Sequence, residues 1–304
     1  MSYLPLKDTP STRVIFETDL CCDVDDVGAL VLLCDAAKRF GINLTGISVN
    51  VNGENSAAAC SALLRRMDMP SLPICVWDGE TPSSGNKSSY VDYLAGCLEP
   101  DRKEKLIVYS PVDFYREILT DSEDGGVVII SVGFFCCMDT ALCRLPELFC
   151  RKVRSVVAMA GTFREKPGYK EFNIRCMPEY AHHFVSEYPG EMIFIASETG
   201  DRVITDLNGC AGCDSDLIFE SYRIYTGGKL TRPSWDLVTV DFAVNGVNER
   251  YSLSERGTAT VTADSESFFT VHEGGRHAYV NFELTHEEIG VIITDMLKDA
   301  AGLK

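Results

Sequence analysis

The stretch VIFETDLCCDVDDVGAL, residues 14–30, decides the fold, because it joins an apolar strand to a helix through an acidic loop. β-Branched and aromatic residues at its start favour a buried strand, and the apolar residues from Val27 onward have helical spacing. Five acidic residues gather where the two segments meet: Glu17, Asp19, Asp23, Asp25 and Asp26. A strand that runs directly into a helix is typical of α/β proteins with a parallel sheet.

The first two hundred residues repeat this alternation of strand and helix. Short runs rich in β-branched residues predict strands at 13–16, 42–51, 73–76, 127–132, 153–160 and 191–196. Segments with helical spacing lie between them, at 27–40, 56–67, 112–119, 138–148 and 178–188. The pattern predicts an α/β fold with an open, mostly parallel, Rossmann-like sheet flanked by helices, from which residues 78–105 depart as a longer excursion.

The C-terminal hundred residues follow a different pattern. Two helices and then three short strands are predicted, at 214–225, 235–244, 258–263, 268–273 and 278–282. The short turns between these strands indicate a small antiparallel elaboration, and Thr285 with Glu288 has the spacing of a capping box that opens a last helix. We expect residues 1–304 to form a single domain, with the elaboration covering about 246–304.

The composition excludes several classes of partner. Lys and Arg total 28 against 45 Asp and Glu, a formal net charge of −17, so the chain would repel phosphate backbones and anionic lipids. The N-terminal residues lack the pattern of a secretory signal, and no apolar run is long enough to span a membrane. We therefore expect neither a nucleic-acid partner nor a membrane partner.

The 13 cysteines are odd in number and include adjacent pairs at 21–22 and 136–137. Without a secretory signal, they indicate buried thiols in a reducing compartment, so a cytoplasmic location is expected. Cys210 and Cys213 have the spacing of a zinc or redox motif, but no second pair accompanies them. A metal or redox role for this pair is therefore the minor interpretation.

The acidic loop has two interpretations. Aspartates near a helix N-terminus stabilise the helix dipole and cap free N–H groups, which accounts for one or two of them. Four aspartates at one turn repel one another, and no basic residue lies nearby in the sequence. A hard divalent cation with oxygen ligands, Ca²⁺ before Mg²⁺, relieves this repulsion. Because α/β proteins bind ligands at the carboxyl ends of their strands, we expect a metal site here.

The pattern Thr18-Asp19-x-x-x-Asp23-Val24-Asp25-Asp26 resembles the N-terminal motif of the inosine-uridine preferring nucleoside hydrolase family, in a variant with a longer loop. Further segments resemble motifs of the same family in the same order, at 129–134, 157–161, 171–173, 178–181 and 232–236. Any one of these segments is a weak signal, but together they span most of residues 13–245.

The resemblance implies Ca²⁺-dependent hydrolysis of the N-glycosidic bond of ribonucleosides, which releases ribose and a free base. It implies that calcium is held by the carboxylates of Asp19, Asp26 and Asp236 and by the carbonyl of Val132. Asp19 would also act as the general base. Such a reaction passes through an oxocarbenium-like ribosyl cation, which nearby carboxylates stabilise.

The resemblance also assigns the sugar contacts. Asp25 and Asn173 would hold the 2′ and 3′ hydroxyls, and Glu171 would hold the 5′ hydroxyl. The resemblance also makes Asp25 a catalytic residue, together with Asp19. The implied partner is a small-molecule ribonucleoside or related riboside. A homo-oligomer, either a dimer or a tetramer, is expected on the same ground.

Two positions depart from the family pattern. Members place an Asn beside the metal, and Asn50 and Asn52 are both candidates for it, so Asn52 is included among the expected substrate-binding residues. Trp235 precedes Asp236 where well-studied members carry a His that can protonate the leaving base. Trp235 either stacks on the base, which places it in the substrate site, or is a core aromatic residue.

Two other classes of protein fit part of the pattern. The missing His is compatible with a non-catalytic or weakly active homologue that binds ribose or nucleosides and keeps the calcium. An aspartate-nucleophile phosphatase needs Asp-x-Asp, which Asp23 and Asp25 provide, but they lie beyond the strand end and no partner Lys motif is visible. The hydrolase interpretation is favoured because the acidic loop, Glu171, Asn173 and Asp236 occur together.

Overall fold

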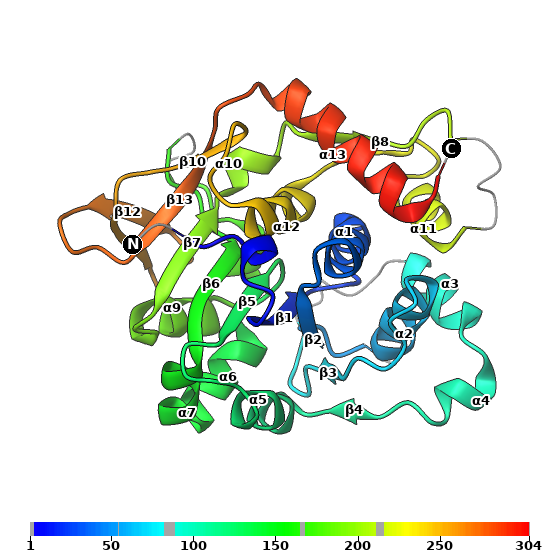
Figure 1. Ribbon diagram of the computed structural model, residues 1–304, viewed down its shortest axis with the longest axis horizontal. Helices are drawn as coiled ribbons and strands as arrows, with labels where there is room; N and C mark the ends of the chain where they lie inside the picture. The colour runs from blue at the N-terminus through cyan, green and yellow to red at the C-terminus, as the bar shows by residue number, and fades with distance from the viewer. Residues whose placement is uncertain (1–2, 54, 82–88, 165–167, 211–215, 304) are drawn as a thin grey trace.

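Strand β1 (Arg13–Thr18) lies at the centre of the fold, between β2 (Asn43–Val49) and β5 (Val127–Ser131) and parallel to both (Figure 1). The computed structural model describes residues 3–53, 55–81, 89–164, 168–210 and 216–303. Almost every residue of β1 and all of β5 are buried. This burial on both faces is expected of strands that helices cover on each side.

The other strands extend this central group in both directions. They are β3 (Ile74–Val76), β4 (Val108–Tyr109), β6 (Val153–Met159), β7 (Glu191–Ile195), β10 (Tyr251–Leu253), β11 (Gly257–Val261), β12 (Ser267–Val271) and β13 (His277–Phe282). The order across the sheet is β12-β11-β13-β7-β6-β5-β1-β2-β3-β4, with β10 on β13. Two further strands, β8 (Ile204–Asp206) and β9 (Thr231–Pro233), form an antiparallel pair.

Helices cover both faces of the sheet. They are α1 (Asp25–Phe40), α2 (Ser56–Arg66), α3 (Ser89–Cys97), α4 (Pro100–Lys103), α5 (Pro111–Thr120), α6 (Cys136–Arg144), α7 (Pro146–Lys152), α8 (Phe172–Cys176), α9 (Pro178–Glu187), α10 (Ser197–Gly200), α11 (Leu217–Tyr225), α12 (Trp235–Asn245) and α13 (His286–Ala301). In Figure 1, α1, α12 and α13 lie above the strands, whereas α5, α6 and α7 lie below them. The α/β class expected from the sequence is confirmed.

The three expected C-terminal strands are β11, β12 and β13, and β11 pairs antiparallel with the other two, as expected. Strand β10, which was not expected, pairs antiparallel with β13. These strands are not a separate layer. Strand β13 pairs in parallel with β7 through His277 and Met192, so the elaboration continues the main sheet. The last helix begins at Thr285 with the expected capping box, in which the Thr285 side chain and Glu288 bond each other's backbone N–H groups.

One expected helix is wrong in detail, and the expected excursion from the sheet contains helices that were not expected. The helix expected at 138–148 is two helices, α6 and α7, because Pro146 has no N–H group to continue α6 and instead occupies the first turn of α7. The excursion expected at 78–105 contains α3 and α4, and α3 packs against α2 and α11. Because this segment is rich in Gly, Ser and Lys, the helical spacing of the apolar residues that α3 buries is not apparent from the sequence.

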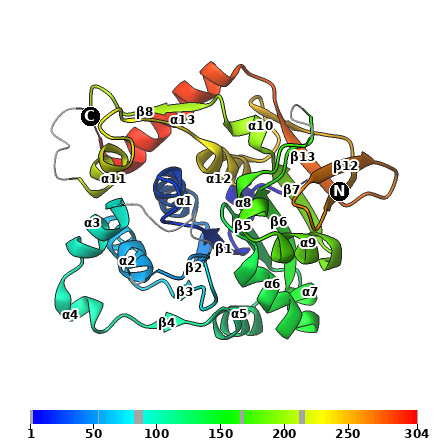
Figure 2. The same cartoon turned by 180° about the vertical axis from the view of Figure 1, so that it is seen from behind.

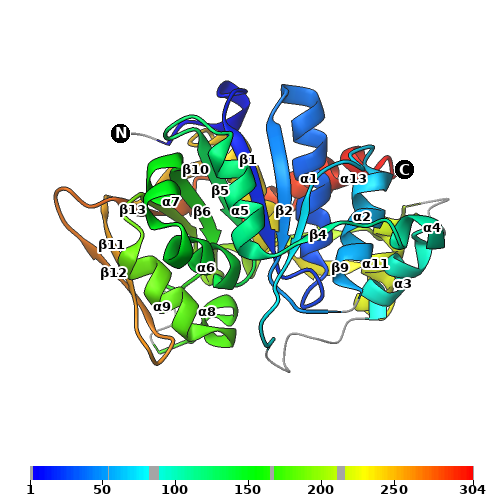
Figure 3. The same cartoon turned by 90° about the horizontal axis from the view of Figure 1, so that it is seen from below.

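The strand order places a switch in direction beside β1. From β1 the chain runs outward on one side through β2, β3 and β4, and then returns to β5 on the other side of β1. The loops that leave the carboxyl ends of β1 and β5 therefore turn away from each other and leave a crevice between them, where open α/β sheets bind ligands. Figure 3 shows α8, β9 and α11 at one end of the sheet.

Candidate active site

A cavity of about 270 Å³ opens at this crevice. Asp19 follows β1, Val132 follows β5 and Met159 ends β6, and all three line it. Further lining side chains come from α1, α8, α11, β9 and α12, which lie far apart in the sequence. They include Asp25, Asp26, Phe172, Asn173, Tyr225, Arg232, Trp235 and Asp236. Seen from behind, α8 lies at the ends of β5 and β6 (Figure 2).

Close packing holds the ends of β1 and β5 together beside the cavity. The backbone N–H of Val132 donates to the Glu17 carbonyl over 2.8 Å. The next residue is Gly133, where a Cβ atom would lie 2.4 Å from the Asp19 nitrogen and 2.5 Å from Asn50 Oδ1. Only glycine allows the two strand ends to approach this closely, so Val132 and Asp19 face the same cavity.

Three carboxylates meet at one point of the cavity wall. Asp25 and Asp26 occupy the first turn of α1, and Asp236 occupies the first turn of α12, which packs against α1. Each offers an oxygen within 4.8 Å of the other two, and all three residues are buried. Asp26 and Asp236 are 210 positions apart in the sequence. The sequence predicts that they share one site, and the fold brings them together.

Arg232 acts on this cluster through Asp25, whose pKa its charge lowers, but it is itself ion-paired with Asp23. Burial above all, and then repulsion from neighbouring aspartates, holds the pKa values of Asp25, Asp26 and Asp236 well above the usual range. Asp26 Oδ1 accepts a short hydrogen bond from the Thr18 hydroxyl, whereas its buried Oδ2 has no partner among the described residues. An unpartnered buried oxygen beside two other carboxylates fits a hard divalent cation.

Asp19 lies in the same cavity but outside the closest group of three. Its charge raises the pKa values of Asp26 and Asp236, and it is itself only 3% exposed. Burial raises the pKa of Asp19 to about 7. A carboxylate with such a pKa is suited to accepting a proton near neutral pH.

Glu171 and Asn173 also line the cavity. Glu171 caps the N-terminus of α8, where its carboxylate accepts hydrogen bonds from the N–H groups of Asn173 and Ile174 over 2.9 and 3.1 Å. Burial raises its pKa to about 7. The Asn173 amide donates to the carbonyl oxygens of Val132 and Met159 over 3.0 and 3.1 Å. Both side chains are therefore held rigidly at the edge of the cavity.

An arginine that the sequence reasoning did not single out, Arg232, lines the cavity. Arg232 forms a two-pronged ion pair with Asp23 of the long acidic loop, with Nε 2.8 Å from Oδ1. Its guanidinium also lies 5.3 Å from the ring centre of Tyr225 and 5.4 Å from that of Trp235. Asp23 is thus paired with Arg232. The only indication of this pair in the sequence was that both residues belong to segments that resemble family motifs.

Trp235 lines the cavity and is partly buried. Its indole N–H donates to the Ser197 carbonyl over 2.9 Å, and Gly200 lies against the ring, where a Cβ atom would come within 2.5 Å of it. Because Arg232 already lies over the ring, Trp235 is a fixed part of the cavity wall. Among the described residues, no histidine lines this cavity.

The two candidate asparagines lie in different surroundings. Asn50 is buried at the end of β2, donates to Glu17 over 2.5 Å and leaves its Oδ1 without a hydrogen-bond partner among the described residues. Asn52 is exposed, its amide donates to the Gly79 carbonyl over 3.0 Å, and it does not line the cavity. The structure does not bring Asn52 to the expected substrate site, because β2 ends before it and the chain turns outward.

Two other expectations concern features outside the cavity. Cys213 lies outside the described residues, so the Cys210–Cys213 spacing has no structural counterpart to report. Within the described ranges, no helix has both the length and the apolar character needed to cross a membrane.

Comparison with solved structures shows the same architecture over nearly the whole chain. A plant nucleoside hydrolase superposes with a TM-score of 0.74 at 16% identity, covering 96% of this chain and 99% of that one. The inosine-uridine preferring nucleoside hydrolase of Bacillus anthracis gives 0.73 at 18% identity, covering 95% and 99%. The type III effector protein XopQ, complexed with adenosine diphosphate ribose, gives 0.65 at 12% identity, covering 98% and 99%.

At these identities the superpositions establish the fold alone. None of the curated protein sequences matches this chain. The family model described as inosine-uridine preferring nucleoside hydrolase, however, matches residues 14–293, which include every element that lines the cavity. The chain therefore belongs to the inosine-uridine preferring nucleoside hydrolase family and is a hydrolase of the nucleoside N-ribohydrolase class.

Proposed function

We propose that this protein hydrolyses the N-glycosidic bond of ribonucleosides in a calcium-dependent reaction. The observation that carries the proposal is that one cavity is lined both by the cluster of Asp25, Asp26 and Asp236 and by the pair Glu171 and Asn173. The first group is a set of hard oxygen ligands for a cation, and the second is a set of polar groups suited to sugar hydroxyls.

The donor set supports calcium as the cation. Asp19, Asp26 and Asp236 with the Val132 carbonyl supply oxygen atoms only, and several carboxylates binding directly suit Ca²⁺ better than Mg²⁺, which retains its waters. When bound there, calcium would lower the pKa of a coordinated water and hold it beside the sugar. The amide of Asn173, which donates to the Val132 carbonyl, would keep that carbonyl aimed into the cavity.

The residues of the cavity would then have separate roles in catalysis and in binding the sugar. Asp19 would accept the proton of the attacking water, since burial places its pKa close to neutrality. Asp25 and Asn173 would fix the 2′ and 3′ hydroxyls, and Glu171 the 5′ hydroxyl. The surrounding carboxylates would stabilise the positive charge that develops on the ribose ring as the base departs.

Ribose release tests this proposal directly. Purified protein is expected to contain close to one calcium per chain and to release ribose from ribonucleosides, with activity falling by about tenfold or more in excess EDTA and returning with Ca²⁺. Elemental analysis and a reducing-sugar assay provide the two measurements. Full activity in EDTA, from a sample free of divalent ions, would contradict the calcium assignment.

Thermal stability should depend on calcium more strongly at high pH. Burial raises the pKa values of Asp19 and Glu171 from 3.8 and 4.5 to about 7, so their protonated forms stabilise the metal-free fold at low pH. That contribution is lost as the pH rises through about 7, because both groups must then ionise in a buried site. A calcium concentration about 100 times the Kd at pH ~8 should raise Tm by about 5 °C at that pH, and the same concentration should raise Tm by less at pH ~5, where protons compete for the carboxylates. Equal Tm values with EDTA and with Ca²⁺ at both pH values would contradict this expectation.

A non-catalytic or weakly active homologue that binds ribosides is the second candidate function. The observation that favours it is Trp235, which stands where a base-protonating His is common and is fixed by Ser197 and Arg232. The structural neighbour XopQ was solved in complex with adenosine diphosphate ribose, and this ligand of that protein supports the second candidate. Hydrolysis of 4-nitrophenyl riboside separates the two functions, since that leaving group needs no proton.

We further propose that residues 1–304 act as one domain, as the continuity of β13 with β7 supports. The partner would be a small-molecule ribonucleoside or related riboside, and not a nucleic acid or a membrane, in line with the net charge of −17. A homo-oligomer is supported by the half-exposed side chains of Phe268 and Val271 on β12 at the edge of the sheet. The many buried thiols support a cytoplasmic location.

A further inference from the structure

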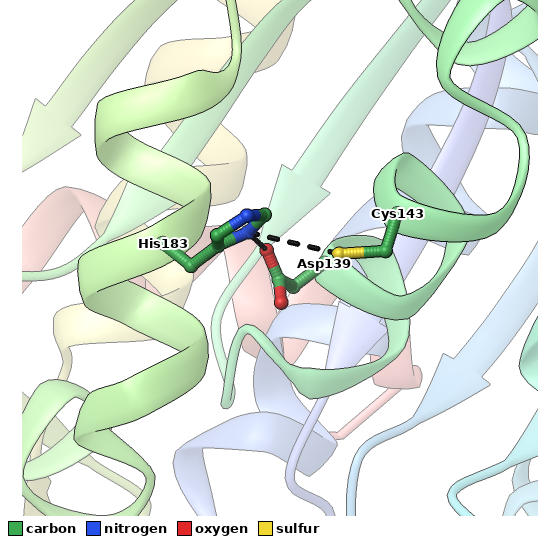
Figure 4. Close-up of side chains that lie close together, drawn as sticks. All are labelled: Asp139, Cys143 and His183. Atoms are coloured by element: carbon green, nitrogen blue, oxygen red, sulfur yellow. Dashed lines mark hydrogen bonds and ion pairs between the residues drawn. The ribbon is translucent and has the colours of Figure 1, made fainter.

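A second cluster of metal-ligating side chains lies outside the cavity, between α6 and α9. Asp139 and Cys143 are one turn apart on α6, and His183 faces them from α9. Figure 4 shows the three side chains pointing toward one another. The distance from His183 Nδ1 to Asp139 Oδ1 is 2.7 Å, and from the same nitrogen to Cys143 Sγ it is 3.8 Å. None of the three lines the cavity described above.

We propose that Asp139, Cys143 and His183 form a binding site for a zinc-like divalent transition metal, with the fourth position open to water or a further ligand. One ligand atom from each residue lies within 4.8 Å of the other two. Zinc–nitrogen and zinc–oxygen bonds of about 2.0 Å and a zinc–sulfur bond of about 2.3 Å give tetrahedral ligand separations of about 3.3–3.6 Å. The observed 2.7 and 3.8 Å differ from these values by about half an ångström, a change within the reach of side-chain rotation.

A hydrogen bond between two helices is the simpler explanation for His183 and Asp139, but it does not account for Cys143. A single Nδ1 atom faces both a carboxylate and a thiol, and one ring nitrogen cannot satisfy both with one proton. A metal ion placed between them would bond all three atoms at once. It would displace the thiol proton to solvent, so that one thiolate and one carboxylate neutralise its two charges.

Two of the three side chains are exposed to solvent. Asp139 is buried, whereas the His183 side chain is 46% exposed and Cys143 is exposed. Burial above all, and then the charges of Asp139 and Glu187, raise the pKa of the Cys143 thiol, and Glu187 follows His183 by one turn of α9. The site is thus reachable from solvent and has a further carboxylate close enough to act on the thiol.

This site differs in chemistry from the carboxylate cluster of the cavity. Its sulfur and imidazole ligands select zinc, cobalt or copper, whereas the all-oxygen cluster selects calcium or magnesium. A metal here would tie α6 to α9. Because α6 begins three residues after Gly133, the ion would steady the segment that carries Val132 without touching the substrate cavity. The proposal is independent of the proposed activity.

Cobalt titration of the calcium-loaded protein tests the proposal. Co²⁺ accepts the same ligands as zinc and gives a sulfur-to-metal charge-transfer band only when a thiolate binds it. The unmodified chain is expected to show this band, and Cys143→Ser to lose it completely. Cys150→Ser, which changes an exposed cysteine on α7, should retain it. His183→Gln should weaken cobalt binding by about tenfold or more.

A second measurement uses the unmodified chain, so it does not depend on the folding of a variant. Zn²⁺ should slow alkylation of Cys143 by iodoacetamide several-fold and leave alkylation of Cys150 unchanged, as followed by peptide mass spectrometry. A cobalt band that survives in Cys143→Ser, the absence of any such band in the unmodified chain, or equal alkylation of Cys143 with and without Zn²⁺ would each overturn the proposal.

Discussion

Replacing Asp19 with Asn is expected to lower kcat by about 10²–10⁴, the usual contribution of a positioned proton acceptor. The change keeps the shape of the side chain and one oxygen but removes both the charge and the proton-accepting group. Asp19 is buried beside Asp26 and Asp236, whose pKa values it raises, so the loss of its charge reduces repulsion in the cluster. The variant should therefore fold at least as well as the unmodified chain in the absence of calcium.

Riboside binding should weaken much less than turnover in Asp19→Asn, because Asp25, Glu171 and Asn173 carry the sugar contacts that we propose. Asp121→Asn is the matched control, since Asp121 is exposed at the end of α5 and far from the cavity in the fold. Steady-state kinetics on 4-nitrophenyl riboside and on a natural ribonucleoside provide the measurement. Turnover in Asp19→Asn equal to that of the control would remove Asp19 from the role of general base. No Asp19-dependent turnover of any riboside would instead establish the binding homologue.

A 2′-deoxynucleoside should be a substrate poorer by roughly 10⁴-fold in kcat/KM than the ribonucleoside with the same base. Sites built to hydrogen-bond a substrate hydroxyl reject the analogue that lacks it, because buried polar groups lose their partner. Asp25, Glu171 and Asn173 are between 1% and 4% exposed, so water would not readily replace the missing hydroxyl.

Kinetics on matched pairs of substrates measure this preference and separate it from recognition of the base. Asn173→Ala should reduce the ratio of the kcat/KM values of ribonucleoside and deoxynucleoside, because it removes a proposed hydroxyl contact that only the ribonucleoside can make. Equal kcat/KM values for the two sugars in the unmodified chain would contradict the assignment of Asp25 and Asn173 to the ribose hydroxyls.

The parts of the site that the sequence predicted are those tied to strand ends and helix starts. Asp25 and Asp26 begin α1 directly after β1, and Asp236 begins α12, so their positions follow from local pattern and from the rule that ligands bind at carboxyl ends of parallel strands. The ordered motifs allowed the family to be identified because they span most of the chain, and the family match confirms it.

The remaining features depend on contacts between distant segments that no local pattern encodes. Asp23 and Arg232 are 209 residues apart, and each alone resembles a solvated charge. Asn50 and Asn52 could not be separated by spacing, since the choice depends on where β2 ends and the chain turns outward. Likewise, the facing of Asp139 and His183 depends on how α6 packs on α9 across 44 positions of the sequence.

The parallel pairing of β13 with β7 has a consequence for the order in which the chain can fold during synthesis. Residues 277–282 are made more than eighty positions after β7, so the backbone groups along that edge of β7 wait unpaired while β8 to β12 and their connections are made. An unpaired edge of this kind can pair with another chain, and contacts of long sequence separation form slowly. A nascent chain that stalls before residue 277 would therefore carry an exposed apolar edge, and translation pauses in the last third of the message should increase aggregation more than pauses within the first.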